Sequence, residues 1–135
     1  MTTKEKPRIL QLEDDPQWAA RLGGYLSDSY DIHSTASVKE ARDWLNEKTF
    51  ALALVDVSLI PGVSGDTQGF QFIEALKGAG FLRDVNIIIV TAYPWRTRIR
   101  KAFRDYGVFD FFDKAKLSPR EFKATVKEAI EAGKA

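Results

Sequence analysis

The sequence contains no cysteine, only one histidine, and no long apolar run. Without cysteine the chain cannot form a disulfide, use a thiol nucleophile or bind a metal through sulfur. The single histidine, His33, excludes a metal site built from several histidines. No stretch approaches the roughly 18 apolar residues of a membrane helix, and the N-terminus MTTKEKP lacks an apolar signal segment. These absences predict a cytoplasmic protein without membrane contact.

The chain also lacks an excess of charge of either sign, with 20 Lys and Arg against 19 Asp and Glu. This balance gives no overall attraction to nucleic acid, so no direct nucleic-acid partner is expected. The length of 135 residues, of which 44% are apolar, suits one globular domain. We expect an N-terminal tail over residues 1–6, a domain over 7–132 and a C-terminal tail over 133–135.

Five short apolar segments alternate with five segments of helical periodicity. The apolar segments are Ile9–Leu12, Tyr30–Ser34, Phe50–Val55, Val85–Val90 and Val108–Phe112. Between them, apolar residues recur every three or four positions, as in the stripe Trp95, Ile99, Phe103 and Tyr106. Strict strand and helix alternation predicts a parallel sheet with helices on both faces, a three-layer α/β sandwich.

Two of the predicted helices begin with a capping-box pattern. Ser37 precedes Glu40 by three residues, and Ser118 precedes Glu121 in the same way. Pro119 follows the second serine, and proline is favoured at the first helical position. The last helix is therefore predicted to begin at Pro119.

Polar residues follow or end four of the five predicted strands. They are Glu13, Asp14 and Asp15 after the first, Asp56 after the third, Thr91 at the fourth, and Asp113 and Lys114 at the end of the fifth. The carboxyl ends of parallel strands share one rim, so these side chains are expected to meet. Clustered carboxylates hold a proton or bind a cation, and an all-oxygen ligand set favours Mg2+. A carboxylate beside Mg2+ can attack phosphorus, with the lysine and threonine compensating the developing charge.

Four segments together resemble the response regulator receiver family, the CheY-like proteins. They are ILQLEDDPQW, ALALVDVSLIPG, IIIVTAY and VFDFFDK, and the resemblance extends from Pro7 to Ala132. It implies a flavodoxin-like (βα)5 fold with strand order 2-1-3-4-5. It also implies a single-domain signalling switch rather than an enzyme, with at most slow self-phosphorylation and self-dephosphorylation.

The same resemblance implies a role for each motif residue. The phospho-acceptor is Asp56, and Mg2+ is bound by Asp14, Asp56 and the backbone carbonyl of Ser58, with Glu13 acting through water. The phosphoryl group is sensed by Thr91 and Lys114, and the switch aromatic is Phe111. A core aromatic is the alternative for Phe111.

The sequence departs from the family pattern at two places. Ala115 follows Lys114 where the family usually has proline, which puts the usual cis peptide in doubt. The segment from Ile60 to Gly69 is longer than usual, and it is either a lid near Asp56 or a tolerated surface insertion. Near the fourth strand, Tyr93 either slows hydrolysis of the phosphoryl group or is an exposed tyrosine without a kinetic role.

The resemblance implies that a sensor histidine kinase or a phosphotransfer protein supplies the phosphoryl group. Output would pass by protein contact, and a homodimer is compatible with the sequence. The Trp95–Arg104 segment carries five basic residues opposite its apolar stripe. This basic helix face indicates either an acidic downstream partner or a merely solvated surface.

Two other functions stay open from the sequence. A phosphatase of the haloacid-dehalogenase type also uses a strand-end aspartate and Mg2+, but it needs a second aspartate two residues after the first. Ser58 stands at that position here, which disfavours turnover. The other alternative is a receiver-like binding module that is never phosphorylated.

Overall fold

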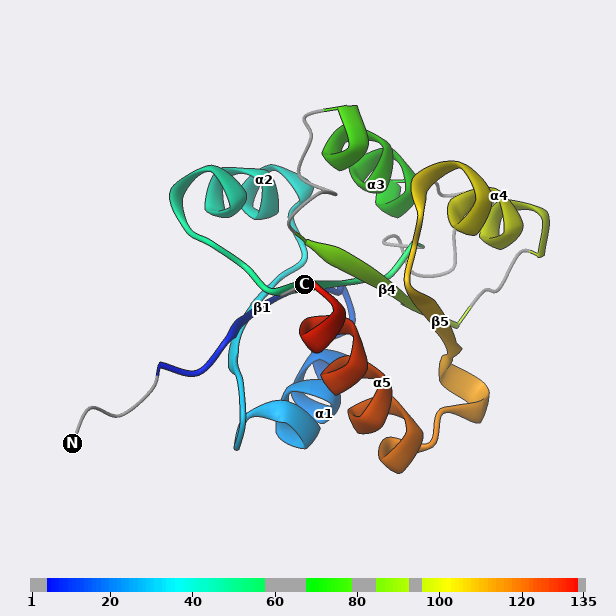
Figure 1. Cartoon of the computed structure of the whole chain (residues 1–135). Helices are drawn as coiled ribbons and strands as arrows, with labels where there is room; N and C mark the ends of the chain where they lie inside the picture. The colour runs from blue at the N-terminus through cyan, green and yellow to red at the C-terminus, as the bar shows by residue number, and fades with distance from the viewer. Residues whose placement is uncertain (1–4, 58–67, 79–84, 93–95, 134–135) are drawn as a thin grey trace.

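The computed structural model describes residues 5–57, 68–78, 85–92 and 96–133. Its five parallel strands form one sheet in the order β2-β1-β3-β4-β5 (Figure 1). The strands are β1 (Arg8–Leu12), β2 (Asp31–Thr35), β3 (Leu52–Val55), β4 (Asn86–Thr91) and β5 (Asp110–Asp113). The helices are α1 (Pro16–Leu26), α2 (Val38–Glu47), α3 (Gln68–Gly78), α4 (Arg96–Tyr106) and α5 (Pro119–Ala132), with a short 3-10 helix η2 (Lys114–Lys116). The flavodoxin-like fold and its strand order are confirmed.

Helices cover both faces of the sheet, α1 and α5 on one side and α2, α3 and α4 on the other (Figure 1). The α1–α5 core contains the helical residues Leu22, Leu26, Phe122, Val126 and Ala129. The α2–α4 core contains Ala41, Leu45, Phe72, Ile73, Ile99 and Ala102. Side chains of β3 and β4 are buried on both faces, which explains why these strands read as nearly continuous apolar runs.

The two helix starts predicted from capping boxes, those of α2 and α5, are confirmed. The Oγ of Ser37 accepts a hydrogen bond from the Glu40 amide at 3.1 Å, and the Oγ of Ser118 accepts one from the Glu121 amide at 3.3 Å. Helix α5 begins at Pro119, as expected. Among the described residues, no helix has the length and apolar character needed to span a membrane.

The predicted apolar stripe on α4 is wrong at one residue. Phe103 is 38% exposed, whereas Ile99 is 7% exposed and Ala102 is fully buried. Residues three and four apart share a helix face, and the face turned toward the α2–α4 core runs through Ile99, Ala102 and Tyr106. Phe103 lies one position further around the helix and faces outward. Trp95 lies outside the described residues.

A buried amide lies in the middle of the central strand β1. Gln11 is 1% exposed, and neither its Nε2 nor its Oε1 has a hydrogen-bond partner among the described residues. Its alternation with Leu10 and Leu12 places it on the sheet face that carries Ile9, under the α1–α5 core. An unpaired buried amide costs roughly 1–3 kcal/mol of stability.

Replacing Gln11 with leucine is therefore expected to raise the free energy of unfolding by about 1–2 kcal/mol, because an apolar side chain needs no hydrogen-bond partner there. Urea unfolding followed by circular dichroism measures the change. Gln17→Leu is the matched control, since Gln17 is exposed on α1 and its replacement should alter stability little. An unchanged or lower stability of Gln11→Leu would show that its amide is satisfied in solution.

Candidate functional site

The residues singled out at the strand ends converge at one rim of the sheet. Glu13 and Asp14 follow β1, and Asp56 follows β3, where its amide donates to the Leu12 carbonyl at 2.9 Å. One carboxylate oxygen from each of these three acids lies within 4.8 Å of one from each of the others. The predicted acidic cluster therefore forms a single pocket, which we call the acidic pocket.

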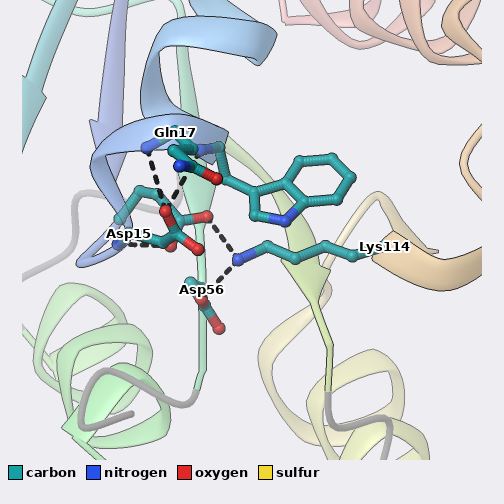
Figure 2. Close-up of polar contacts among 6 residues, drawn as sticks. Asp15, Gln17, Asp56 and Lys114 are labelled. Atoms are coloured by element: carbon teal, nitrogen blue, oxygen red, sulfur yellow. Dashed lines mark hydrogen bonds and ion pairs between the residues drawn. The ribbon is translucent and has the colours of Figure 1, made fainter.

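Lys114 reaches into the acidic pocket from the far edge of the sheet. Its Nζ lies 2.7 Å from Glu13 Oε1 and 2.9 Å from Asp56 Oδ2. Figure 2 shows its extended side chain directed at Asp56. The side chains of Lys114, Glu13 and Asp56 are only 6%, 2% and 4% exposed, respectively. Buried charges require close partners, and here one ammonium serves two carboxylates.

The pocket shifts the acid–base behaviour of its members. Burial, followed by the charge of Asp56, raises the pKa of Glu13 to about 8, although the hydrogen bond from Lys114 opposes the shift. Burial likewise raises the pKa of Asp14. Burial alone would lower the pKa of Lys114, but the hydrogen bond to Glu13 and the charge of Asp56 raise it above its ordinary value. The pocket is thus short of positive charge.

This shift predicts how stability depends on pH when a chelator removes divalent cations. Between about 4.5 and about 8 the folded chain keeps a proton on Glu13 that the unfolded chain has lost, so stability should fall as pH rises through this range. The decrease should be on the order of 1 kcal/mol or more. Urea unfolding at several pH values measures it, and Glu13→Gln should flatten the slope. Equal slopes in the two proteins would contradict the assignment to Glu13.

The start of α1 is fixed beside the pocket. Asp15 caps this helix, its Oδ1 accepting hydrogen bonds from the amides of Gln17 at 2.9 Å and Trp18 at 3.4 Å (Figure 2). The Asp15 amide in turn donates to Glu13 Oε2 at 3.2 Å. Both oxygens of Glu13 are thus engaged, one by a backbone amide and the other by Lys114.

Two further predicted residues lie on β4 and β5. Thr91 ends β4, is fully buried and is aligned with Asp113 in the neighbouring strand. Phe111 is half-buried in β5 and packs against the α2–α4 core. The Lys114–Ala115 peptide bond is trans. Ser58 and Tyr93 lie outside the described residues, as does the Ile60–Gly69 segment except for its end.

The donor set of the pocket fits a hard divalent cation. Its three carboxylates offer only oxygen ligands, which Mg2+ prefers over the nitrogen and sulfur ligands typical of zinc. Burial raises the pKa values of Glu13 and Asp14, and the charge of Asp56 adds to both shifts. A bound cation would compensate this crowding of carboxylates. The arrangement can therefore hold a metal next to a carboxylate and an ammonium.

Comparison with protein families identifies the family, because the model of the response regulator receiver domain matches residues 9–127. The chain belongs to this family. Receiver domains are signalling modules of two-component systems, they are typically non-catalytic, and they generally work with histidine kinases. The acidic pocket of this receiver is of the type that binds Mg2+ in the family.

Solved structures share the fold of this receiver at low sequence identity. A sensor protein from Polaromonas sp. JS666 is 25% identical, with a TM-score of 0.80 over 94% of this chain and 98% of that chain. A receiver domain from Methanospirillum hungatei JF-1 is 21% identical, with a TM-score of 0.79 over 96% and 98%. TrrA from Thermotoga maritima, solved in complex with Mg2+ and BeF, is 23% identical, with a TM-score of 0.70 over 91% and 98%. No curated protein matches the sequence.

Sequence reasoning missed a glycine that allows α3 to approach the pocket. A Cβ added to Gly69 would collide with the Cα of Val57 and the carbonyl oxygen of Asp56. Only a residue without a side chain fits against this backbone. Its place at the end of a glycine-rich segment was the available signal, but a close backbone approach follows only from the folded structure.

Gly69→Ala is expected to lower the free energy of unfolding by about 1–3 kcal/mol, since the backbone beside Asp56 must shift to admit the methyl group. The matched control is Gly78→Ala in the same helix, where an added Cβ meets nothing within 4 Å. That substitution should leave stability unchanged or raise it. Thermal unfolding compares the two, and equal effects would contradict the close approach.

Proposed function

We propose that this receiver is a phosphorylation switch that accepts a phosphoryl group on Asp56 in the presence of Mg2+. One observation carries the proposal: the Lys114 ammonium lies 2.9 Å from Asp56 Oδ2 within a cluster of three carboxylates. A nucleophilic carboxylate, a cation site and a fixed ammonium are the groups that phosphoryl transfer requires. Membership of the receiver family supports the same function.

Asp14 and Asp56 would hold the Mg2+, together with the Ser58 carbonyl predicted from the family pattern. When bound, the ion neutralises charge on the phosphoryl oxygens. Glu13 is assigned a contact through water, which is supported by the engagement of both its oxygens with Lys114 and the Asp15 amide.

The chain's own residues perform the transfer in one displacement. An Oδ of Asp56 attacks the phosphorus of a kinase phosphohistidine or of a small acyl phosphate. The phosphorus–donor bond breaks, and the leaving group departs with its electron pair. The Lys114 ammonium and the Thr91 hydroxyl donate hydrogen bonds to the new phosphoryl oxygens, which carry a charge of about −1.5 to −2.

The signal would then leave the rim through a change in the neighbouring surface. Movement of Thr91 toward the phosphoryl group would alter the packing of Phe111 and bias the surface of α4 and β5. Helix α4 exposes three basic residues, Arg100, Lys101 and Arg104. This basic surface supports an acidic protein as the downstream partner. A kinase or phosphotransfer partner, a homodimer and a cytoplasmic location belong to the same proposal.

Incubation with Mg2+ and acetyl phosphate, followed by intact mass spectrometry, tests the proposed function. The switch predicts a single labile phosphoryl adduct that forms only with Mg2+. Rapid multiple-turnover release of phosphate would instead favour a phosphatase of the haloacid-dehalogenase type. The complete absence of an adduct would favour a receiver-like binding module that is never phosphorylated.

A further inference from the structure

Trp18 lies at the edge of the acidic pocket, and none of the roles assigned above involves its side chain. Its partly buried ring packs against the α1–α5 core. The Lys114 Nζ lies over the ring, 5.3 Å from its centroid. This distance is within the roughly 6 Å at which the negative face of an indole attracts an ammonium. Trp18 therefore contacts the ammonium that is paired with Asp56.

The backbone of Trp18 and its ring each have a further contact beside the pocket. Its backbone amide is bound by the capping carboxylate of Asp15 at 3.4 Å, which fixes the first turn of α1 next to the pocket. Three residues further along the helix, the exposed guanidinium of Arg21 lies 4.5 Å from the centroid of the same ring. The helix start therefore fixes the backbone of Trp18, and a second cation contacts its ring.

Lys114 needs such a contact because it carries a long side chain from the edge strand into a site where little water reaches it. Its side chain is 6% exposed, and two carboxylate oxygens, one from Glu13 and one from Asp56, lie next to the ammonium. A flexible lysine loses considerable rotamer entropy when it is held in one place. An aromatic face beside the ammonium favours the extended conformation that reaches Asp56.

We propose that Trp18 is a positioning residue for phosphoryl transfer, which holds the Lys114 ammonium at Asp56 so that it meets the incoming phosphoryl oxygens. The inference rests on the proposed function in that Asp56 is taken as the acceptor. In the transfer the Asp56 oxygen–phosphorus bond forms and the donor–phosphorus bond breaks. Lys114 stays protonated throughout, and Trp18 exchanges no proton or electron.

The first test needs no phosphorylation. In NMR spectra of the full chain, the ring current of Trp18 should displace the resonances of the Lys114 CεH2 group from their usual position. Trp18→Leu should abolish the displacement, and Trp18→Phe should restore part of it. Trp44→Leu is the matched control, because Trp44 is a partly buried indole that packs in the α2–α4 core. Loss of Trp44 should leave the Lys114 signals unchanged.

The second test measures the rate of phosphorylation by acetyl phosphate at saturating Mg2+. Trp18→Leu is expected to lower the rate constant about threefold to tenfold, the range that a cation–π contact of ordinary strength supplies. Trp18→Phe should recover part of the rate. Trp44→Leu should keep the wild-type rate even if its stability falls, so a general packing defect is distinguished from a loss of positioning. Arg21→Ala, which leaves the core untouched, should show a smaller decrease.

The results separate the positioning role from the proposed function. If the wild type acquires no phosphoryl group while the Lys114 signals depend on Trp18, the proposed function fails and the contact stands without a role in transfer. If the signals do not change in Trp18→Leu, the contact is absent from solution and the inference is wrong. If the signals change but the rate does not, the ring contacts Lys114 without positioning it for reaction, which also overturns the inference.

Discussion

The Asp56→Asn protein is expected to remain unmodified when it is incubated with Mg2+ and acetyl phosphate under conditions that phosphorylate the wild type. The asparagine amide keeps the size of the side chain but removes the anionic oxygen that attacks phosphorus. Lys114 retains its ion pair with Glu13 at 2.7 Å, so the variant should fold. Removing one of three crowded carboxylates also reduces their repulsion. Intact mass spectrometry measures the loss of the adduct.

Asp15→Asn supplies the matched control for that substitution. Asp15 lies two residues after Glu13 and caps α1, and asparagine caps helices as well as aspartate does. This variant should therefore keep both its fold and its phosphorylation. An adduct that persists on Asp56→Asn would place the acceptor at another residue and refute the assignment.

Lys114→Met is expected to lower the free energy of unfolding by about 3 kcal/mol in the presence of a chelator, since it leaves the buried Asp56 carboxylate without its counter-charge and Glu13 without its hydrogen bond. The lysine is 6% exposed and bonded to both Glu13 and Asp56, so no water replaces it readily. Saturating Mg2+ should restore a large part of the loss, because the ion supplies the missing positive charge. The same variant should be phosphorylated much more slowly than the wild type.

Lys116→Met is the control, because Lys116 belongs to the same 3-10 helix but is exposed. Its stability should stay within about 0.5 kcal/mol of the wild type with or without Mg2+. Urea unfolding of the wild type and of both variants, each with chelator and with Mg2+, gives the values needed. If Lys114→Met were no less stable than Lys116→Met in chelator, the buried ion pairs would have no net stabilising effect.

The architecture of the site could be predicted because parallel-sheet geometry determines it. Asp56 and Lys114 are 58 residues apart in the chain, yet each directly follows a strand, and parallel strands deliver their carboxyl ends to one rim. Strict alternation of strands and helices fixed the fold class, and serine caps fixed the start of α5. The helix caps and the strand and helix pattern depend on local sequence. The meeting of the strand-end residues depends on one rule, that parallel strands bring their carboxyl ends to the same rim of the sheet.

Other features depend on how the elements pack, and the sequence carries no direct signal for them. Phe103 has the spacing of a buried residue, but the rotation of α4 against the sheet exposes it. Gly69 resembles any loop glycine until α3 lies against the Asp56 backbone. Trp18 has the spacing of a core residue of α1, and its contact with the Lys114 ammonium, which comes from the far end of the chain, follows only from the folded structure. Each of these requires the tertiary arrangement.

A crystal structure of the chain with Mg2+ and beryllofluoride, an analogue of the phosphoryl group, tests the central claim most directly. The account predicts beryllofluoride joined to Asp56, with Lys114 bonded to one of its fluorides and a metal ion bound by Asp14 and Asp56. Beryllofluoride attached to another residue, or a metal bound away from the acidic pocket, would contradict it.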